Sequence, residues 1–235
     1  MKILALGNSF SEDCTAYLER MTDEDVTVRN LYIGGCSLSR HNDNLREGIA
    51  DYELQRNGRM LGESHVSANE IMTSQAWDVI TVQEVSGNSG HYGDFSETLR
   101  EVLGRIRALC PTARPVWNQT WAYASNSTHG RFSEYGCDRE RMFAEIEASS
   151  HRAAADNGLG LIEVGRVIQA LRRSDLADET EFCRDGFHLS LTEGRYAAAY
   201  VWARYFGFCV NDFVPEGADA DRIRAIRDFI DGTEI

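Results

Sequence analysis

The stretch KILALGNSFS, residues 2–11, predicts a short strand followed at once by a polar turn. Residues 2–6 form a short, largely apolar run, and Gly7 marks a turn after it. Ser9 then stands between this strand and a segment of helical period. In an open parallel sheet such a position lies at the carboxyl end of a strand, where ligands bind.

The same pattern recurs along the chain, because short apolar runs alternate with longer segments of helical period. It predicts an α/β fold with a five-stranded parallel sheet and helices on both faces. The polar segment 34–62 is expected to be a long irregular connection with a short helix. We expect strands at 2–6, 26–33, 78–83, 115–119 and 161–164, and helices at 12–21, 66–75, 95–109, 134–157, 167–173, 191–206 and 219–230.

The length and charge of the chain exclude several classes of partner. Its 235 residues suit one domain spanning 1–235. The formal net charge of −13 disfavours nucleic acid and anionic membranes as partners. No apolar run approaches the roughly 20 residues that span a bilayer, and 2–6 is too short for a signal-peptide core. We expect a cytoplasmic protein, or one whose leader has been removed; the sequence does not indicate its oligomeric state.

Metal and cofactor motifs are absent from the sequence. The six cysteines are scattered, without a Cys-x-x-Cys pair or a histidine at ligand spacing, so reduced and mostly buried thiols are expected. No Gly-rich phosphate-binding loop follows a predicted strand, which disfavours a flavodoxin-like nucleotide binder. We therefore expect no metal and no cofactor.

Two segments from opposite ends of the chain carry the side chains of a Ser-His-Asp hydrolase, namely Ser9 and the pair Asp185 and His188. A serine hydroxyl needs an imidazole to take its proton and a carboxylate to orient that imidazole. In a loop, the spacing of Asp185 and His188 lets the carboxylate reach Nδ1 while Nε2 faces the nucleophile. Another interpretation of Ser9 remains open, because Ser9 and Glu12 also fit a helix capping box. A second capping box at 190–193 would tie the loop to a helix.

Polar residues also follow the other predicted strands. Gly35 follows the second strand and either offers a backbone N–H to an oxyanion or belongs only to a tight turn. Gln83 ends the third strand, where its amide would donate to the same oxyanion or simply meet solvent. Beyond the fourth strand, aromatic and amide side chains either bind a sugar ring or pack a helix. The candidates for binding substrate are Asn118, Trp121, Tyr123 and His129.

These motifs together resemble the four sequence blocks of the SGNH (GDSL-like) hydrolase superfamily. Residues 77–86 and 120–123 look like a bacterial branch of it that is known mainly as a domain of unknown function. The resemblance implies a flavodoxin-like three-layer sandwich that hydrolyses esters, including acetyl groups on carbohydrates and acyl groups on lipids or thioesters. It also implies that Ser9 is the nucleophile, His188 the base and Asp185 its orienter, with the N–H groups of Ser9 and Gly35 as oxyanion donors.

The third block departs from the superfamily pattern Gly-x-Asn-Asp, because this chain reads QEVSGN at 83–88. Either Gln83 is the third oxyanion donor or Asn88 reaches back from a longer loop, and we favour Gln83 because a strand end is better fixed. The sequence thus predicts a serine esterase that hydrolyses small esters with short acyl groups. An acetyl ester of a saccharide is the expected substrate. The alternatives are a lipid or thioester acyl hydrolase and a non-catalytic saccharide-binding module. No apolar lid or interfacial helix favours a lipid.

Overall fold

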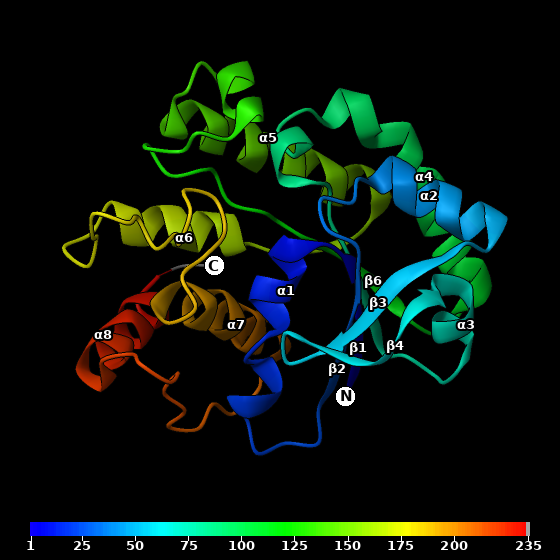
Figure 1. Cartoon of the computed structure of the whole chain (residues 1–235), viewed down its shortest axis with the longest axis horizontal. Coiled ribbons are helices and arrows are strands. Elements are labelled where there is room, and N and C mark those ends of the chain that lie inside the picture. Colours follow the sequence, from blue (N-terminus) through cyan, green and yellow to red (C-terminus); the bar gives the residue numbers. More distant parts are fainter. Residues whose placement is uncertain (234–235) are drawn as a thin grey trace.

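A seven-stranded sheet forms the centre of the protein (Figure 1). The computed structural model describes residues 1–233, without the side chains of residues 63 and 64. The strand order is β4 (Arg59–Ser67), β3 (Ala50–Arg56), β2 (Thr27–Tyr32), β1 (Lys2–Gly7), β5 (Val79–Val82), β6 (Arg114–Asn118) and β7 (Gly160–Ile162). Strands β2, β1, β5, β6 and β7 are parallel, whereas β3 and β4 are antiparallel additions at one edge.

Helices cover both faces of the sheet because β1 buries alternate side chains on opposite sides. Ile3 and Ala5 belong to one apolar core, and Leu4 and Leu6 belong to the other. The first core is covered by α1 (Ser9–Thr15), α6 (Val164–Arg172), α7 (Glu193–Phe206) and α8 (Ala220–Asp231). The second is covered by α2 (Leu38–Glu47), α3 (Ala68–Thr73) and α4 (Tyr92–Leu109), while α5 (Arg139–Asn157) contacts α4 and α6.

The predicted α/β architecture is confirmed. The five expected strands form the parallel part of the sheet, and their order is the flavodoxin-like order 2-1-3-4-5 when only these strands are counted. Three short 3₁₀ helices, Leu18–Arg20, Ser86–Asn88 and Gly130–Tyr135, complete the elements of the described residues. No helix among residues 1–233 is long and apolar enough to cross a membrane.

The segment 34–62 differs from the irregular connection that the sequence led us to expect. After α2 it forms β3 and the first part of β4, so the sheet has two more strands than predicted. The turn between them is Asn57-Gly58, and both residues have positive φ angles, of 51° and 67°. Asn-Gly is the strongest short-range hairpin signal, because such turns need left-handed conformations at both central positions. That signal was present in the sequence and was missed.

Candidate active site

The turn between β1 and α1 places Ser9 at the first helical position. Asn8, and not Ser9, caps α1, because the Asn8 side chain accepts a hydrogen bond from the N–H of Phe10 at 3.0 Å. The N–H of Asn8 in turn donates to Oγ of Ser11 at 2.9 Å, which completes a capping box. The box that was expected at Ser9 and Glu12 therefore lies one residue earlier. The hydroxyl of Ser9 is not used to cap the helix.

The structure brings Ser9, His188 and Asp185 together at the carboxyl edge of the sheet. Oγ of Ser9 lies 2.8 Å from Nε2 of His188. Nδ1 of the same ring lies 2.7 Å from Oδ2 of Asp185. The other carboxylate oxygen accepts the N–H groups of His188 and Phe187, at 2.8 and 3.2 Å, so the carboxylate is held in place. This is the geometry of a nucleophile, a base and an orienting carboxylate.

The surroundings of Asp185 favour its ionised form. Partial burial alone would raise the pKa of its carboxyl group, but hydrogen bonds from the His188 ring and from the backbone N–H groups of His188 and Phe187 outweigh that effect and lower the pKa. An ionised Asp185 accepts a hydrogen bond from Nδ1–H of His188. That bond keeps Nε2 available to accept the proton of Ser9.

Two residues that line the cleft, Ser9 and Gly35, have backbone N–H groups available for a developing negative charge. Within the described part of the chain, the N–H groups of Ser9 and Gly35 donate to no backbone carbonyl oxygen. Gly35 has a φ of 62°, and the space beside its Cα is open, so a carbonyl oxygen can approach closely. The loop that carries Gly35 is tied to the helix cap, because Nδ2 of Asn8 donates to the carbonyl oxygen of Cys36 at 2.9 Å. The arrangement suits an oxyanion hole.

Gln83 lies behind this site and not in it, which differs from its expected position as a third oxyanion donor. Its side chain is buried, its Nε2 donates to Oδ1 of Asn8 at 2.9 Å, and its Oε1 accepts from Asn118 at 2.7 Å. Asn88, the alternative donor, accepts a hydrogen bond from Arg131 at 2.6 Å. Neither amide lines the hollow beside Ser9. Gln83 instead supports the cap of the helix that begins with Ser9.

Three of the four expected substrate-binding residues are also buried. Asn118, Trp121 and Tyr123 are at most 1% exposed; Asn118 ends the interior strand β6, and the other two follow it closely. Trp121 stacks on Phe10 with ring centroids 4.1 Å apart, and its indole N–H donates to the carbonyl oxygen of Phe187 at 2.8 Å. These side chains support the floor of the site from beneath. Only His129 reaches the hollow beside Ser9.

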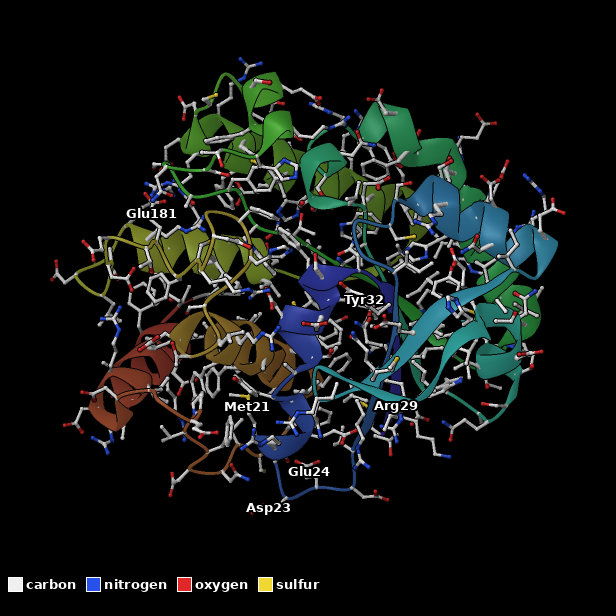
Figure 2. The ribbon with its side chains drawn as sticks, in the orientation of Figure 1. Met21, Asp23, Glu24, Arg29, Tyr32 and Glu181 are labelled. Carbon is white, nitrogen blue, oxygen red and sulfur yellow. The ribbon has the colours of Figure 1, made fainter. Side chains whose placement is uncertain are left out.

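A cleft of about 280 Å³ opens beside Ser9 and His188. His129 contributes a neutral imidazole, because burial, His188 and Arg131 lower its pKa. Its Nδ1 accepts the N–H of Arg131 at 3.2 Å, so its proton is on Nε2. Tyr32, at the end of β2, lies close to the start of α1 (Figure 2). The other lining residues are Asn8, Phe10, Glu12, Gly34, Gly35, Val85, Ser86, Arg184 and Phe187.

Sequence reasoning missed several residues that line this cleft. Phe187 lies inside the Asp-x-x-His motif, and Arg184 directly precedes it. Tyr32 and Val85 lie at the ends of the second and third predicted strands, where side chains reach the carboxyl edge of the sheet. Their positions beside the motifs were the available signal. Their residue types alone did not indicate a site, since aromatic and branched side chains are common in cores.

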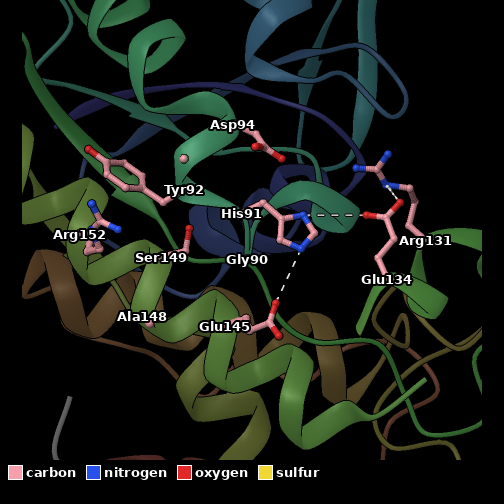
Figure 3. Close-up of a pocket in the computed structure, with 11 residues that line it drawn as sticks. Gly90, His91, Tyr92, Asp94, Arg131, Glu134, Glu145, Ala148, Ser149 and Arg152 are labelled. Carbon is pink, nitrogen blue, oxygen red and sulfur yellow. Dashed lines mark ion pairs between the residues drawn. The ribbon is translucent and has the colours of Figure 1, made fainter. Parts of the chain in front are cut away.

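A larger hollow of about 870 Å³ lies at the start of α4 and has different chemistry (Figure 3). His91 stands there between Glu134 and Glu145, at 3.9 and 3.7 Å. Ser149 also lines this hollow, but its buried hydroxyl has no hydrogen-bond partner among the described residues. The hollow therefore contains no hydrogen-bonded serine and histidine. The side chains that the structure describes also include no group of three or more suited to hold a metal ion.

Comparison with known proteins places the chain in a family. The family model described as a domain of unknown function (DUF4886) matches residues 2–226. A crystal structure of a DUF4886 family protein from Bacteroides uniformis is 31% identical; the match covers 99% of this chain and 95% of that one, with a TM-score of 0.83. A comparison with curated proteins found no match.

Two more distant structures share the fold. A candidate SGNH hydrolase from Slackia heliotrinireducens is 24% identical, with a TM-score of 0.62 and coverage of 88% of this chain and 99% of that one. A catalytic mutant of an acetylxylan esterase from Geobacillus stearothermophilus is 12% identical, with a TM-score of 0.54 and coverage of 88% and 94%. The chain therefore belongs to the DUF4886 family and has the fold of the SGNH (GDSL-like) hydrolases.

Proposed function

We propose that the protein is a serine esterase in which Ser9 is the nucleophile, His188 the general base and Asp185 the residue that orients it. The observation that carries the proposal is the continuous chain of hydrogen bonds from Asp185 through His188 to Ser9, at 2.7 and 2.8 Å. The capping of α1 by Asn8 supports it further, because Ser9 then has no structural task that would explain its position.

The reaction proceeds through an acyl-enzyme. Oγ of Ser9 attacks the ester carbonyl carbon while Nε2 of His188 takes the hydroxyl proton. The carbonyl oxygen becomes negatively charged and is stabilised by the N–H groups of Ser9 and Gly35. His188 returns the proton to the departing alcohol. Water then attacks the acyl-enzyme with the same base, which releases the acid and restores Ser9.

The size and lining of the cleft favour a short acyl group. At about 280 Å³ the cleft lies at the small end of ligand pockets. Phe10, Val85 and Phe187 provide a limited apolar wall, whereas Tyr32 and His129 offer polar groups. An acetyl ester of a saccharide suits this combination, because the sugar hydroxyls can bond to the polar groups. The fold shared with an acetylxylan esterase agrees with this choice.

A fluorophosphonate probe tests the proposal directly, because it forms a covalent bond only with an activated serine. We expect labelling of Ser9 in the native protein and none in Ser9→Ala. Ser149→Ala is a matched control, since this hydroxyl lies in the other hollow. Hydrolysis of p-nitrophenyl acetate and of acetylated saccharides completes the test. If the native protein is neither labelled nor active, it is a non-catalytic module, and a preference for long acyl chains would indicate a lipid or thioester hydrolase.

A further inference from the structure

Asp13 is a charged side chain in the interior, one helical turn after Ser9. It is 0% exposed. Its Oδ1 accepts hydrogen bonds from Arg184 at 3.0 Å and from Arg195 at 2.7 Å, and its Oδ2 accepts the backbone N–H of Leu189 at 2.9 Å. A buried carboxylate is costly unless it is paired and hydrogen-bonded, and Asp13 is both.

The partners of Asp13 lie on both sides of the segment that carries Asp185 and His188. Arg184 directly precedes Asp185, and Leu189 directly follows His188. The segment is also closed on itself, because the N–H of Arg184 donates to the carbonyl oxygen of His188 at 2.9 Å. One carboxylate on α1 is therefore bonded to both ends of the turn that presents the imidazole.

Arg195 connects the same carboxylate to α7. Its Nε bonds to Asp13, and its Nη2 bonds to Glu12 at 2.7 Å. Helices α1 and α7 lie side by side on one face of the sheet (Figure 1). Since α1 begins at Ser9, the placement of the nucleophile and that of the base both depend on Asp13.

We propose that Asp13 is a positioning residue that aligns Oγ of Ser9 with Nε2 of His188 by fixing α1 against residues 184–189. Its kinetic effect rests on the proposed esterase function, whereas its geometric effect does not require turnover. A displacement of about 1 Å between reacting groups can lower a rate by roughly 100-fold, so a loss of this alignment should be visible in the reaction rate.

Asp13→Asn tests the proposal, because it keeps the size of the side chain. It replaces one acceptor oxygen by an N–H₂ group, which faces the donors that now bond to the carboxylate. We expect kcat for p-nitrophenyl acetate and the rate of fluorophosphonate labelling of Ser9 to fall roughly 10- to 100-fold, with KM changed less than about 3-fold. Leu103→Ala is the control for lost stability alone, since Leu103 is buried in α4 on the other face of the sheet. It should leave both rates unchanged well below its thermal midpoint.

A readout without turnover separates this inference from the proposed function. The Nδ1–H proton of His188 should give a low-field NMR signal, assigned by its loss in His188→Ala, that shifts or broadens in Asp13→Asn. A native protein that is not labelled would overturn the esterase proposal, while the NMR signal would still decide the role of Asp13.

Asp13 has only a structural role if Asp13→Asn lowers the thermal midpoint but keeps the native signal and the native labelling rate. If Asp13→Asn does not fold, Arg195→Gln weakens the same network; Arg195 does not line the cleft, and Glu12→Gln is the control for the lost bond to cleft-lining Glu12. We then expect a smaller change in the same direction, and an unchanged signal together with an unchanged labelling rate would overturn the proposal.

Discussion

Oγ of Ser9 lies 2.8 Å from Nε2 of His188, although the two residues are 179 positions apart in the chain. Ser9 stands at the start of α1, and His188 is held on a turn just before α7. Neither side chain belongs to the apolar core. Each can therefore be replaced with little loss of stability, so that an effect on activity can be measured separately.

Ser9→Ala and His188→Ala should each lower kcat for an acetyl ester by at least about 10³-fold, because in the proposed mechanism the nucleophile and the base act as one unit. The thermal midpoint should stay nearly unchanged. Asn8→Ala should differ in its effect on stability and cost about 1 kcal/mol, since Asn8 is the helix cap. Kinetics and thermal unfolding of the three variants check this. A Ser9→Ala variant that is less stable but fully active would assign capping to Ser9.

Gln83→Ala should lower stability by roughly 1–3 kcal/mol, because it leaves the buried amide of Asn118 without its acceptor and removes a support of Asn8. A loss of kcat should accompany it through the displaced cap. The native Asn88 side chain bonds to exposed Arg131, so Asn88→Ala should change stability and kcat much less. Urea unfolding and steady-state kinetics of the two variants give the comparison. A large loss of kcat in Asn88→Ala at native stability would make Asn88 an oxyanion donor after all.

Short acyl chains should be preferred, because the cleft has room for few apolar contacts beyond Phe10, Val85 and Phe187. Each added methylene should therefore gain little of the ~0.8 kcal/mol that full burial provides. We expect kcat/KM to be highest for p-nitrophenyl acetate and to fall from butyrate to octanoate. A rise with chain length would contradict the polar-cleft argument.

The residues that bind a sugar should be those in the cleft and not the buried aromatics. His129→Ala should raise KM for an acetylated saccharide more than for p-nitrophenyl acetate, because the imidazole lines the cleft. Trp121→Ala should instead cost about 3–5 kcal/mol of stability, since it empties a buried site beneath Phe10. The KM ratios of the two substrates and the unfolding curves decide between these roles. A stable Trp121→Ala variant with selective loss of saccharide activity would restore Trp121 as a binding residue.

Glu84 should make the stability of the protein depend on pH. Burial raises its pKa to about 7, and the N–H groups of Val85 and Leu38 oppose the rise without cancelling it. The folded protein then holds a proton that the unfolded chain releases near the ordinary glutamate pKa of 4.5. Protonated Glu84 contributes about 3 kcal/mol to the free energy of unfolding. This contribution is fully present below pH 4.5 and is lost as the pH rises through 7.

Glu84→Gln should remove this dependence, because the amide oxygen can still accept both N–H groups but carries no proton to lose. Urea unfolding of both proteins at pH 5 and pH 8 measures the difference. We expect the variant to gain stability relative to the native protein between these values. Parallel changes in the two proteins would show that Glu84 does not titrate in this range.

The sequence by itself determined the parallel sheet and the place of the candidate site. Short apolar runs specify buried strands, and polar residues just after them must lie at one edge, since parallel strands all end there. Ser9 and Gly35 were found in that way, whereas His188 was found through its Asp-x-x-His spacing. The Asn57-Gly58 hairpin was equally available, because its signal is local.

Only the tertiary structure decided which polar and aromatic side chains face the cleft. Trp121 and Gln83 look like binding residues in sequence, but helices and neighbouring strands bury them. Asp13 looks like one more acidic residue of a short helix, and its importance depends on Arg184 and Arg195, which are more than 170 positions away. Burial and long-range pairing depend on how the elements pack, which local patterns do not specify.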